Sequence, residues 1–231
     1  MKFLHSPSTR TLAATLVVTV FALAIAAGAN AGSSPDAEEI VAEVQQYYSG
    51  VGDYRCEFTQ TTAHKLFPGR LERSYGKLSF KKGGLMRWEY SRPENKLFVW
   101  DGKALWIHEP EVPQVFTGTA DAERLRRGLA FLTGEGRILD DYQAKKLDAG
   151  KFGFAATGHV LKLTPKAKGS PFRHVEIYVD GASFRVVRSV VVDHEGNRNR
   201  LDFEKPEINV GLDNGLFSFT PPPGVPVIRA E

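Results

Sequence analysis

The side chains that could support catalysis are few in this sequence, and none of them follows a known catalytic spacing. The six histidines include no metal-binding pair of the HExxH type. A GxSxG nucleophile motif, a P-loop and a dinucleotide-binding glycine motif are also absent from the sequence. Asp140 and Asp141 are adjacent carboxylates, but such neighbours at a helix end are usually solvated. We therefore expect no catalysis, no metal and no cofactor, with an enzyme kept open as an alternative.

The chain has a single cysteine, Cys56, so it cannot form an internal disulfide. Cys56 alternates with Tyr54 and Phe58 in a segment that has the pattern of a strand. This position is typical of a small, buried apolar residue. A structural role is the first interpretation of Cys56, and a redox or covalent role is the alternative.

A binding site is favoured over a catalytic one, and short strands are the elements that must shape it. Residues 75–115 hold apolar runs separated by Gly83-Gly84, residues 92–95 and Asp101-Gly102. An Asp-Gly pair between apolar runs predicts a tight hairpin with a type I′ turn. We expect residues 97–100 to pair antiparallel with 104–108, and 76–81 with 85–91. Both faces of these strands are apolar, so both must be covered by protein or by a ligand.

The rest of the chain predicts two helices and further strands. Residues 33–48 have a helical apolar stripe, with Ser34 as the expected cap, and residues 120–133 have helical periodicity again. Strands are expected at 54–62, 70–81, 160–164, 174–179, 184–192 and 198–204. The predicted fold class is mainly β (α+β): a strongly curved antiparallel sheet forming an incomplete β-barrel of about 11 strands. The N-terminal helix and a central lid helix would cover a hydrophobic cavity.

Residues 1–31 have the pattern of a cleavable secretory signal peptide. Lys2 and Arg10 are basic, an uncharged apolar run follows, and Ala29-Asn30-Ala31 has the small-residue pattern of a cleavage site. Residues 32–231 are then expected to form a single domain in the periplasm. They contain 28 Lys and Arg against 27 Asp and Glu, once the two basic residues of the signal segment are removed. Such a balance argues against nucleic-acid binding.

Several short motifs follow one another between residues 81 and 115: Lys81-Lys82, Gly83-Gly84, Met86-Arg87-Trp88, Pro93, V-x-D-G-x-x-L-W at 99–106, and Gln114-Val115. Their order resembles that of the LolA-type periplasmic lipoprotein carriers. The similarity continues through residues 128–142, 161–165 and 217–222, and so covers nearly all of residues 32–231. One departure is that the family carries Arg-Pro where this chain has Lys82-Gly83.

This resemblance implies a chaperone without cofactors that carries acylated lipoproteins. Its expected partners are an ATP-dependent exporter complex in the inner membrane and an acceptor at the outer membrane, and the carrier itself is expected to be a monomer. The expected acyl-binding cavity is lined by Leu78, Phe80, Trp88, Leu97, Val99, Trp106, Leu125, Leu129 and Leu132. The resemblance also implies that the basic residue at the Lys82 position helps to govern how cargo is held and passed on, so we expect Lys82, Leu85 and Met86 to form a transfer loop.

Two other classes of binding protein remain open from the sequence. One is a periplasmic binder of another lipid, and the other is an envelope-stress or lipid sensor module. Lipid that purifies with the protein would separate the first class from a lipoprotein carrier, because a lipoprotein brings a polypeptide with it. A sensor would instead bind a membrane signalling protein and transfer nothing.

Overall fold

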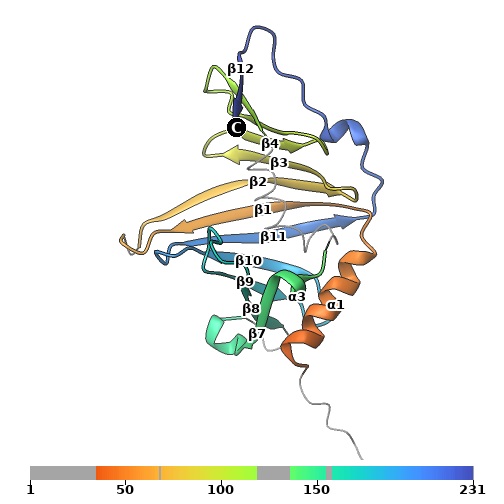
Figure 1. Ribbon diagram of the computed structural model, residues 1–231, viewed down its shortest axis with the longest axis vertical. Coiled ribbons are helices and arrows are strands. Elements are labelled where there is room, and N and C mark those ends of the chain that lie inside the picture. The colour runs from red at the N-terminus through yellow and green to blue at the C-terminus, as the bar shows by residue number, and fades with distance from the viewer. Residues whose placement is uncertain (1–34, 68, 119–135, 155–157, 231) are drawn as a thin grey trace, which may run out of the picture. The chain divides into compact units, whose positions relative to one another are not determined.

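Twelve β-strands joined edge to edge in one sheet dominate the computed structural model (Figure 1). The structure describes residues 35–67, 69–118, 136–154 and 158–230, and residues 35–231 form one compact unit. The helix expected at residues 120–133, with Leu125, Leu129 and Leu132, lies outside the described residues. Among the helices that are described, none is long and apolar enough to span a bilayer.

The strands follow the short apolar runs and turn signals of the sequence. In chain order they are β1 (Asp53–Ala63), β2 (Leu71–Lys81), β3 (Leu85–Arg92), β4 (Lys96–Trp100), β5 (Leu105–His108), β6 (Val115–Gly118), β7 (Tyr142–Leu147), β8 (His159–Pro165), β9 (His174–Val179), β10 (Val186–Val192), β11 (Arg198–Ile208) and β12 (Val227–Ala230). The helical elements of the described residues are α1 (Ala37–Ser49), α3 (Ile138–Asp141), η1 (Ala149–Phe152) and η2 (Asn214–Phe217).

The sheet is curved and open, as the fold class predicts. Its strand order is β12-β6-β5-β4-β3-β2-β1-β11-β10-β9-β8-β7, so among the described strands β12 and β7 are the edges and do not pair to close a barrel. Bulges interrupt the ladders of β1 with β11, β2 with β3, and β9 with β10, and bulges of this kind bend a sheet. The sheet has twelve strands rather than about eleven, and β6, β7 and β12 lie outside the strand ranges expected from the sequence. The edge strand β12 pairs parallel with β6.

Helix α1 begins later than predicted, because its cap is Asp36 and not Ser34. The Asp36 carboxylate accepts hydrogen bonds from the Glu38 and Glu39 backbone N–H groups at 2.8 and 2.9 Å. The Glu39 side chain accepts one in return from the Asp36 N–H at 2.8 Å. This reciprocal pair of bonds is a capping box, which satisfies backbone donors that the first helical turn leaves free.

The hairpin of β4 and β5 confirms the predicted pairing but not the predicted turn type. Trp100 pairs with Leu105, so four residues form the connection. Gly102 has a positive φ of 89°, whereas Asp101 does not have a positive φ, so this is not a type I′ turn. The Asp101 carboxylate instead closes the loop by accepting hydrogen bonds from the Lys103 and Ala104 N–H groups, both at 2.8 Å.

Candidate functional site

The face of the sheet on which α1 packs is apolar over most of its strands, and we call it the inner face. Four buried side chains of α1, Ile40, Val41, Val44 and Tyr48, belong to one core cluster with strand residues of this face. Those strand residues include Leu161, Ile177 and Val186. The Tyr48 hydroxyl accepts a hydrogen bond from the Val186 N–H at 3.3 Å, and burial raises the pKa of Tyr48. Helix α1 therefore closes the part of the inner face formed by β8 to β10.

Aromatic rings cover the neighbouring part of the inner face, on β1 to β4. The Phe58 ring meets those of Trp88 and Tyr90 edge to face, with centroids 5.4 and 5.0 Å apart. Tyr90 in turn lies 6.1 Å from Phe98, centroid to centroid. Phe98 and Trp100 are only half-buried. We call Phe58, Trp88, Tyr90, Phe98 and Trp100 the aromatic row. The row offers apolar contact area that the described residues do not cover completely.

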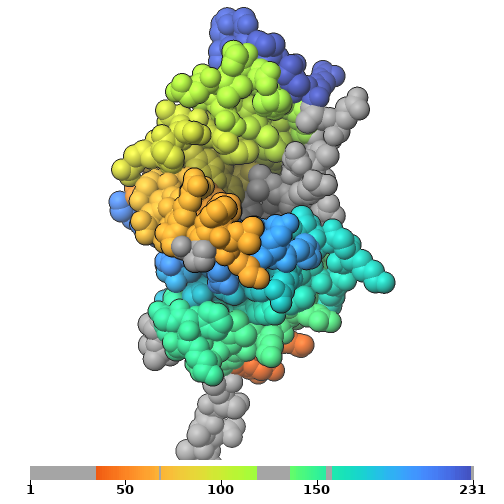
Figure 2. Space-filling model, turned by 90° about the vertical axis from the view of Figure 1, so that its left-hand side faces the viewer, coloured from red at the N-terminus to blue at the C-terminus, as the bar shows by residue number. Residues whose placement is uncertain are grey.

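A cleft of about 270 Å³ opens at one end of the aromatic row. Its lining combines apolar rings with polar groups: Gln60, Ser74, Tyr90, Pro93, Glu94, Lys96 and Phe98. The Tyr90 hydroxyl donates to Gln60 Oε1 at 2.6 Å, and Gln60 Nε2 donates to Asn199 Oδ1 at 2.9 Å. Burial raises the pKa of Tyr90 to about 12, so its hydroxyl stays protonated as a donor. Figure 2 shows the molecule hollowed beside the β1–β2 hairpin.

Two buried polar groups on the inner face, the Tyr54 hydroxyl and the Trp88 indole N–H, have no hydrogen-bond partner among the described residues. Trp88 Nε1 is buried, and the residues that the structure describes give it no hydrogen-bond acceptor. The indole is 6% exposed and belongs to the part of the aromatic row that lies within the core cluster. A buried N–H without an acceptor carries a desolvation penalty that a bound carbonyl oxygen would remove.

The residues predicted to line a cavity divide between the two faces of the sheet. Leu78, Phe80 and Trp88 are buried on the inner face, within the main core cluster. Leu97, Val99 and Trp106 lie on the opposite face, which we call the outer face, so grouping them with the first three residues is wrong. The ladder shows this directly: Trp88 pairs with Phe98, and side chains alternate along a strand. Of the β4 residues, Phe98 and Trp100 face inward.

The C-terminal segment covers the outer face where Leu97, Val99 and Trp106 lie. The Phe219 ring lies 5.8 Å from Trp106 and 5.5 Å from His108, centroid to centroid. Phe217, at the end of η2, is 1% exposed. The Leu216 carbonyl accepts a hydrogen bond from Arg87 Nη1 at 3.2 Å. The outer apolar residues thus anchor this segment of the same chain, which explains why both faces of the sheet are apolar.

Sequence reasoning missed the inner-face residues of β4, β5 and β6. Phe98 pairs with Ile107, and Ile107 pairs with Phe116, so these half-buried side chains continue the aromatic row across the sheet. The turn of residues 92–95 would have misled the assignment, because counting outward from it pairs Trp88 with Val99. The ladder joins Tyr90 to Lys96 across five residues, which puts Trp88 opposite Phe98 and hence on the same face.

The predicted transfer loop lies at the C-terminal end of α1. The Lys82 N–H donates to the Gly52 carbonyl at 2.8 Å, and Lys82 Nζ approaches the Ser49 carbonyl at 3.5 Å. Gly83 and Gly84 have φ values of 96° and 80°, which glycine adopts without strain. Lys82 is exposed and Leu85 half-buried. Met86 was expected at the rim, but it faces inward and is only 9% exposed.

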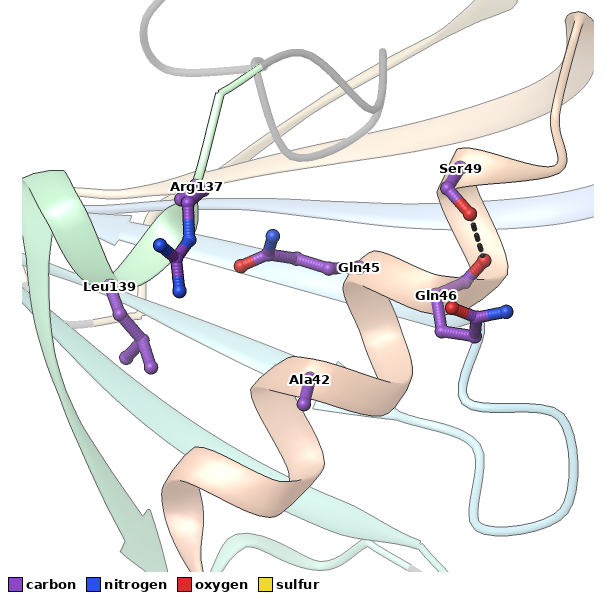
Figure 3. A pocket seen from close by; sticks show the side chains of 6 residues that line it. All are labelled: Ala42, Gln45, Gln46, Ser49, Arg137 and Leu139. Atoms are coloured by element: carbon purple, nitrogen blue, oxygen red, sulfur yellow. Dashed lines mark hydrogen bonds between the residues drawn. The ribbon is translucent and has the colours of Figure 1, made fainter.

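A second cleft, of about 340 Å³, separates α1 from the segment that leads into α3 (Figure 3). Ala42, Gln45, Gln46 and Ser49 line it from α1, and Arg137 and Leu139 line it from the other side. Gln45 Oε1 accepts a hydrogen bond from the Ile138 N–H at 3.1 Å, which ties the two elements together. Among the described residues, no aromatic ring lines this cleft, so we assign the apolar site to the inner face, where the aromatic rings gather.

The ionisable groups singled out from the sequence have structural environments. Burial raises the pKa of the Cys56 thiol to about 12, so the thiol stays protonated and is a poor nucleophile. Asp101 accepts a third hydrogen bond, from Trp106 Nε1 at 2.9 Å, in addition to the two that close its turn. Burial opposes its ionisation, but these bonds outweigh it and lower the pKa of Asp101. Within the described residues, no group of three His, Cys, Asp or Glu side chains is placed to bind a metal ion.

The fold and the site define a class of open, curved β-sheet proteins in which a helix covers part of an apolar inner face. A structure of an uncharacterised conserved protein from Thermus thermophilus shares the fold, with a TM-score of 0.51 and 16% identity. The similarity covers 84% of this chain and 98% of that one.

The sequence places the chain in a family. Residues 49–220 match the profile described as outer membrane lipoprotein carrier protein LolA. The outer-membrane lipoprotein carrier protein of Chromobacterium violaceum is 32% identical over 211 residues, covering 91% of this chain and 96% of the relative. The protein of the same name from Methylibium petroleiphilum is 30% identical, covering 91% and 97%. This chain therefore belongs to the LolA family of outer-membrane lipoprotein carrier proteins.

Proposed function

We propose that this protein is a periplasmic carrier that shields the acyl chains of lipoproteins on their way to the outer membrane. The observation that carries the proposal is the aromatic row of the inner face, in which Tyr90, Phe98 and Trp100 are only half-buried, in a member of the LolA family. An acyl chain of about fourteen carbons has a transfer free energy on the order of 10 kcal/mol, at about 0.8 kcal/mol per methylene. Such a chain cannot cross water unless an apolar surface covers it.

The polar groups beside the row suit the link between acyl chain and polypeptide. The Trp88 indole N–H is a buried donor without an acceptor among the described residues, and an ester carbonyl of the cargo would satisfy it only if the surrounding side chains move aside. The Tyr90–Gln60–Asn199 chain of hydrogen bonds lies at the cleft, where the polar part of a lipoprotein would leave the protein. Binding of this kind requires no catalysis, and we assign none to the chain.

The carrier is proposed to work in the periplasm, with one partner at the inner membrane and another at the outer membrane. Residues 1–31 act as a cleaved signal peptide, and the domain that begins near Gly32 works in the periplasm. Cargo is released to it by an ATP-dependent exporter complex of the inner membrane and is delivered to an acceptor at the outer membrane. The support for these steps is the signal-like N-terminal sequence and the family membership.

The site on the inner face is tested by a matched pair of variants in β4. Phe98 and Leu97 are neighbours and both are half-buried, but they point to opposite faces. Phe98→Gln is expected to weaken binding of a triacylated lipopeptide at least about tenfold, because burying a Phe side chain contributes about 1.5–3 kcal/mol. Leu97→Gln is expected to bind the lipopeptide like the parent. Equal binding by both variants, with normal folding, would show that the inner face is not the acyl site.

Lys82 is proposed to regulate how readily cargo is held and passed on. Its ammonium lies beside the carboxyl end of α1, where the helix carries partial negative charge. Lys82→Leu removes this contact, and we expect it to change the rate of lipoprotein transfer severalfold. Lys82→Arg keeps the charge and is expected to transfer at close to the parent rate. If the leucine variant transferred cargo at the parent rate, residues 82–84 would have no role in transfer beyond connecting β2 to β3.

A further inference from the structure

The tip of the β1–β2 hairpin exposes large apolar side chains that no described element covers. Leu66 and Phe67 are 84% and 61% exposed, and Leu71, at the start of β2, is 49% exposed. In Figure 1 the hairpin reaches beyond the neighbouring strand ends on its side of the sheet, and Figure 2 looks onto it. Adjacent exposed apolar side chains on one loop usually mark a contact surface.

Hydrogen bonds hold this tip in a fixed form. The Phe67 N–H donates to the His64 carbonyl and the Arg70 N–H donates to the Phe67 carbonyl, both at 3.1 Å. The Lys65 N–H donates to Asn197 Oδ1 at 3.1 Å, which fastens the tip to the turn between β10 and β11. The two apolar side chains are therefore presented by a braced loop.

Basic residues surround the apolar ones. Residues 64–73 contain Lys65, Arg70 and Arg73, against one carboxylate, Glu72, which pairs with Arg70 at 3.4 Å. The adjoining turn carries two carboxylates, Asp193 and Glu195, which accept hydrogen bonds from uncharged groups of that turn and so keep their charge. The basic residues of the hairpin segment itself, on both sides of Leu66 and Phe67, complement a bilayer surface that contains anionic lipids, where each basic residue strengthens binding.

The position of the tip links it to the cleft. Gln60 and Ser74 line the cleft and pair with each other. Along the ladder they lie three residue pairs away from Ala63 and Leu71, the pair at the base of the tip. Three pairs correspond to about 10 Å along a strand. Pro93 and Glu94 of the cleft lie in the β3–β4 turn at the same end of the sheet, because Tyr75 pairs with Arg92. A surface touching the tip therefore lies close to the mouth of the cleft.

We propose that the β1–β2 hairpin inserts Leu66 and Phe67 into the interface of an anionic phospholipid bilayer and so sets the mouth of the cleft against the membrane. The inference rests on the proposed carrier function and adds the membrane as a direct contact. A bilayer suits this tip better than a protein does. Specific protein interfaces bury about 1,600 Å² in total, which a few side chains on one turn cannot supply, whereas insertion into lipid needs only an apolar tip.

The test is flotation of the mature protein with vesicles of phosphatidylcholine, alone or mixed with phosphatidylglycerol. The double variant Leu66→Glu/Phe67→Glu is expected to lose at least about tenfold in affinity for the mixed vesicles. Val210→Glu changes another exposed apolar residue, 48% exposed, and is expected to bind like the parent. Arg73→Gln is expected to lose about fivefold on the mixed vesicles and little on the neutral ones.

Three results would overturn the inference. The double variant could bind like the parent, the parent could bind neither kind of vesicle, or binding could require membrane proteins in the vesicles. The last result would identify a protein partner instead. Loading with a triacylated lipopeptide in detergent is measured in parallel, and all variants are expected to load. If the unsubstituted protein binds vesicles but does not take up the lipopeptide, the carrier function is contradicted while the membrane contact is still supported.

Discussion

Replacing Gly76 with alanine is expected to prevent folding or to lower the free energy of unfolding by more than about 3 kcal/mol. Gly76 lies on the inner face of β2, opposite Phe58 on one side and Tyr90 on the other. A Cβ atom at this position would overlap the Glu89 carbonyl oxygen and lie 2.7 Å from Phe58 Cζ. The carbonyl belongs to the paired strand, so it cannot move away without breaking the ladder of β2 with β3.

Chemical denaturation of the mature domain measures this effect. Gly50→Ala is a suitable control, because a Cβ there meets its nearest atom, the Tyr47 carbonyl oxygen, at an ordinary 3.6 Å. Gly50 also has a negative φ of −83°, which alanine adopts readily. The control is expected to change stability by less than about 0.5 kcal/mol. If both variants were equally stable, the close approach of Phe58 and β3 over Gly76 would be contradicted.

Asp53→Ala is expected to destabilise the domain by about 3 kcal/mol. The Asp53 side chain accepts hydrogen bonds from the backbone N–H groups of Val210, Gly211 and Leu212, at 2.9, 3.0 and 3.2 Å. Asp53 is only 6% exposed, so removing the carboxylate leaves these donors without a partner where water has little access. The loop they form leads into η2 and the segment that covers the outer face.

The stability of Asp53→Ala is compared by urea denaturation with that of Asp213→Ala. Asp213 also caps a backbone N–H group, that of Gly215 at 2.7 Å, but it is exposed and makes a single such bond. Its loss is expected to cost about 1 kcal/mol or less. A cost for Asp53→Ala no larger than that of the control would mean that the loop of residues 210–212 is held by other contacts.

Local chemistry made most strands predictable. Turn residues such as Gly83-Gly84 and Asp101-Gly102 stand between apolar runs, and the strands β2 to β5 begin and end close to them. The start of α1 was placed too early because Ser34, Pro35 and Asp36 are all good residues for a helix N-terminus. The reciprocal bonds between Asp36 and Glu39 decide between them.

It was harder to predict which side chains of each strand point to the inner face, because the outer face is covered by residues far away in the sequence. Val99 and Trp106 are apolar because the C-terminal segment, with Phe217 and Phe219, packs over that side. Nothing near β4 in the sequence indicates such a cover. Edge strand β12 was missed for a similar reason, since its partner β6 precedes it by more than a hundred residues.

Native mass spectrometry of the protein isolated from the periplasm can show directly whether it carries lipoproteins by their acyl chains, as we claim. The mature chain is predicted to begin near Gly32 and to carry additional mass that fragments into a polypeptide with an acylated N-terminus. Phe98→Gln is predicted to lose that mass, whereas Leu97→Gln keeps it. Free fatty acid or phospholipid in place of an acylated polypeptide would contradict the claim and favour a carrier of another lipid.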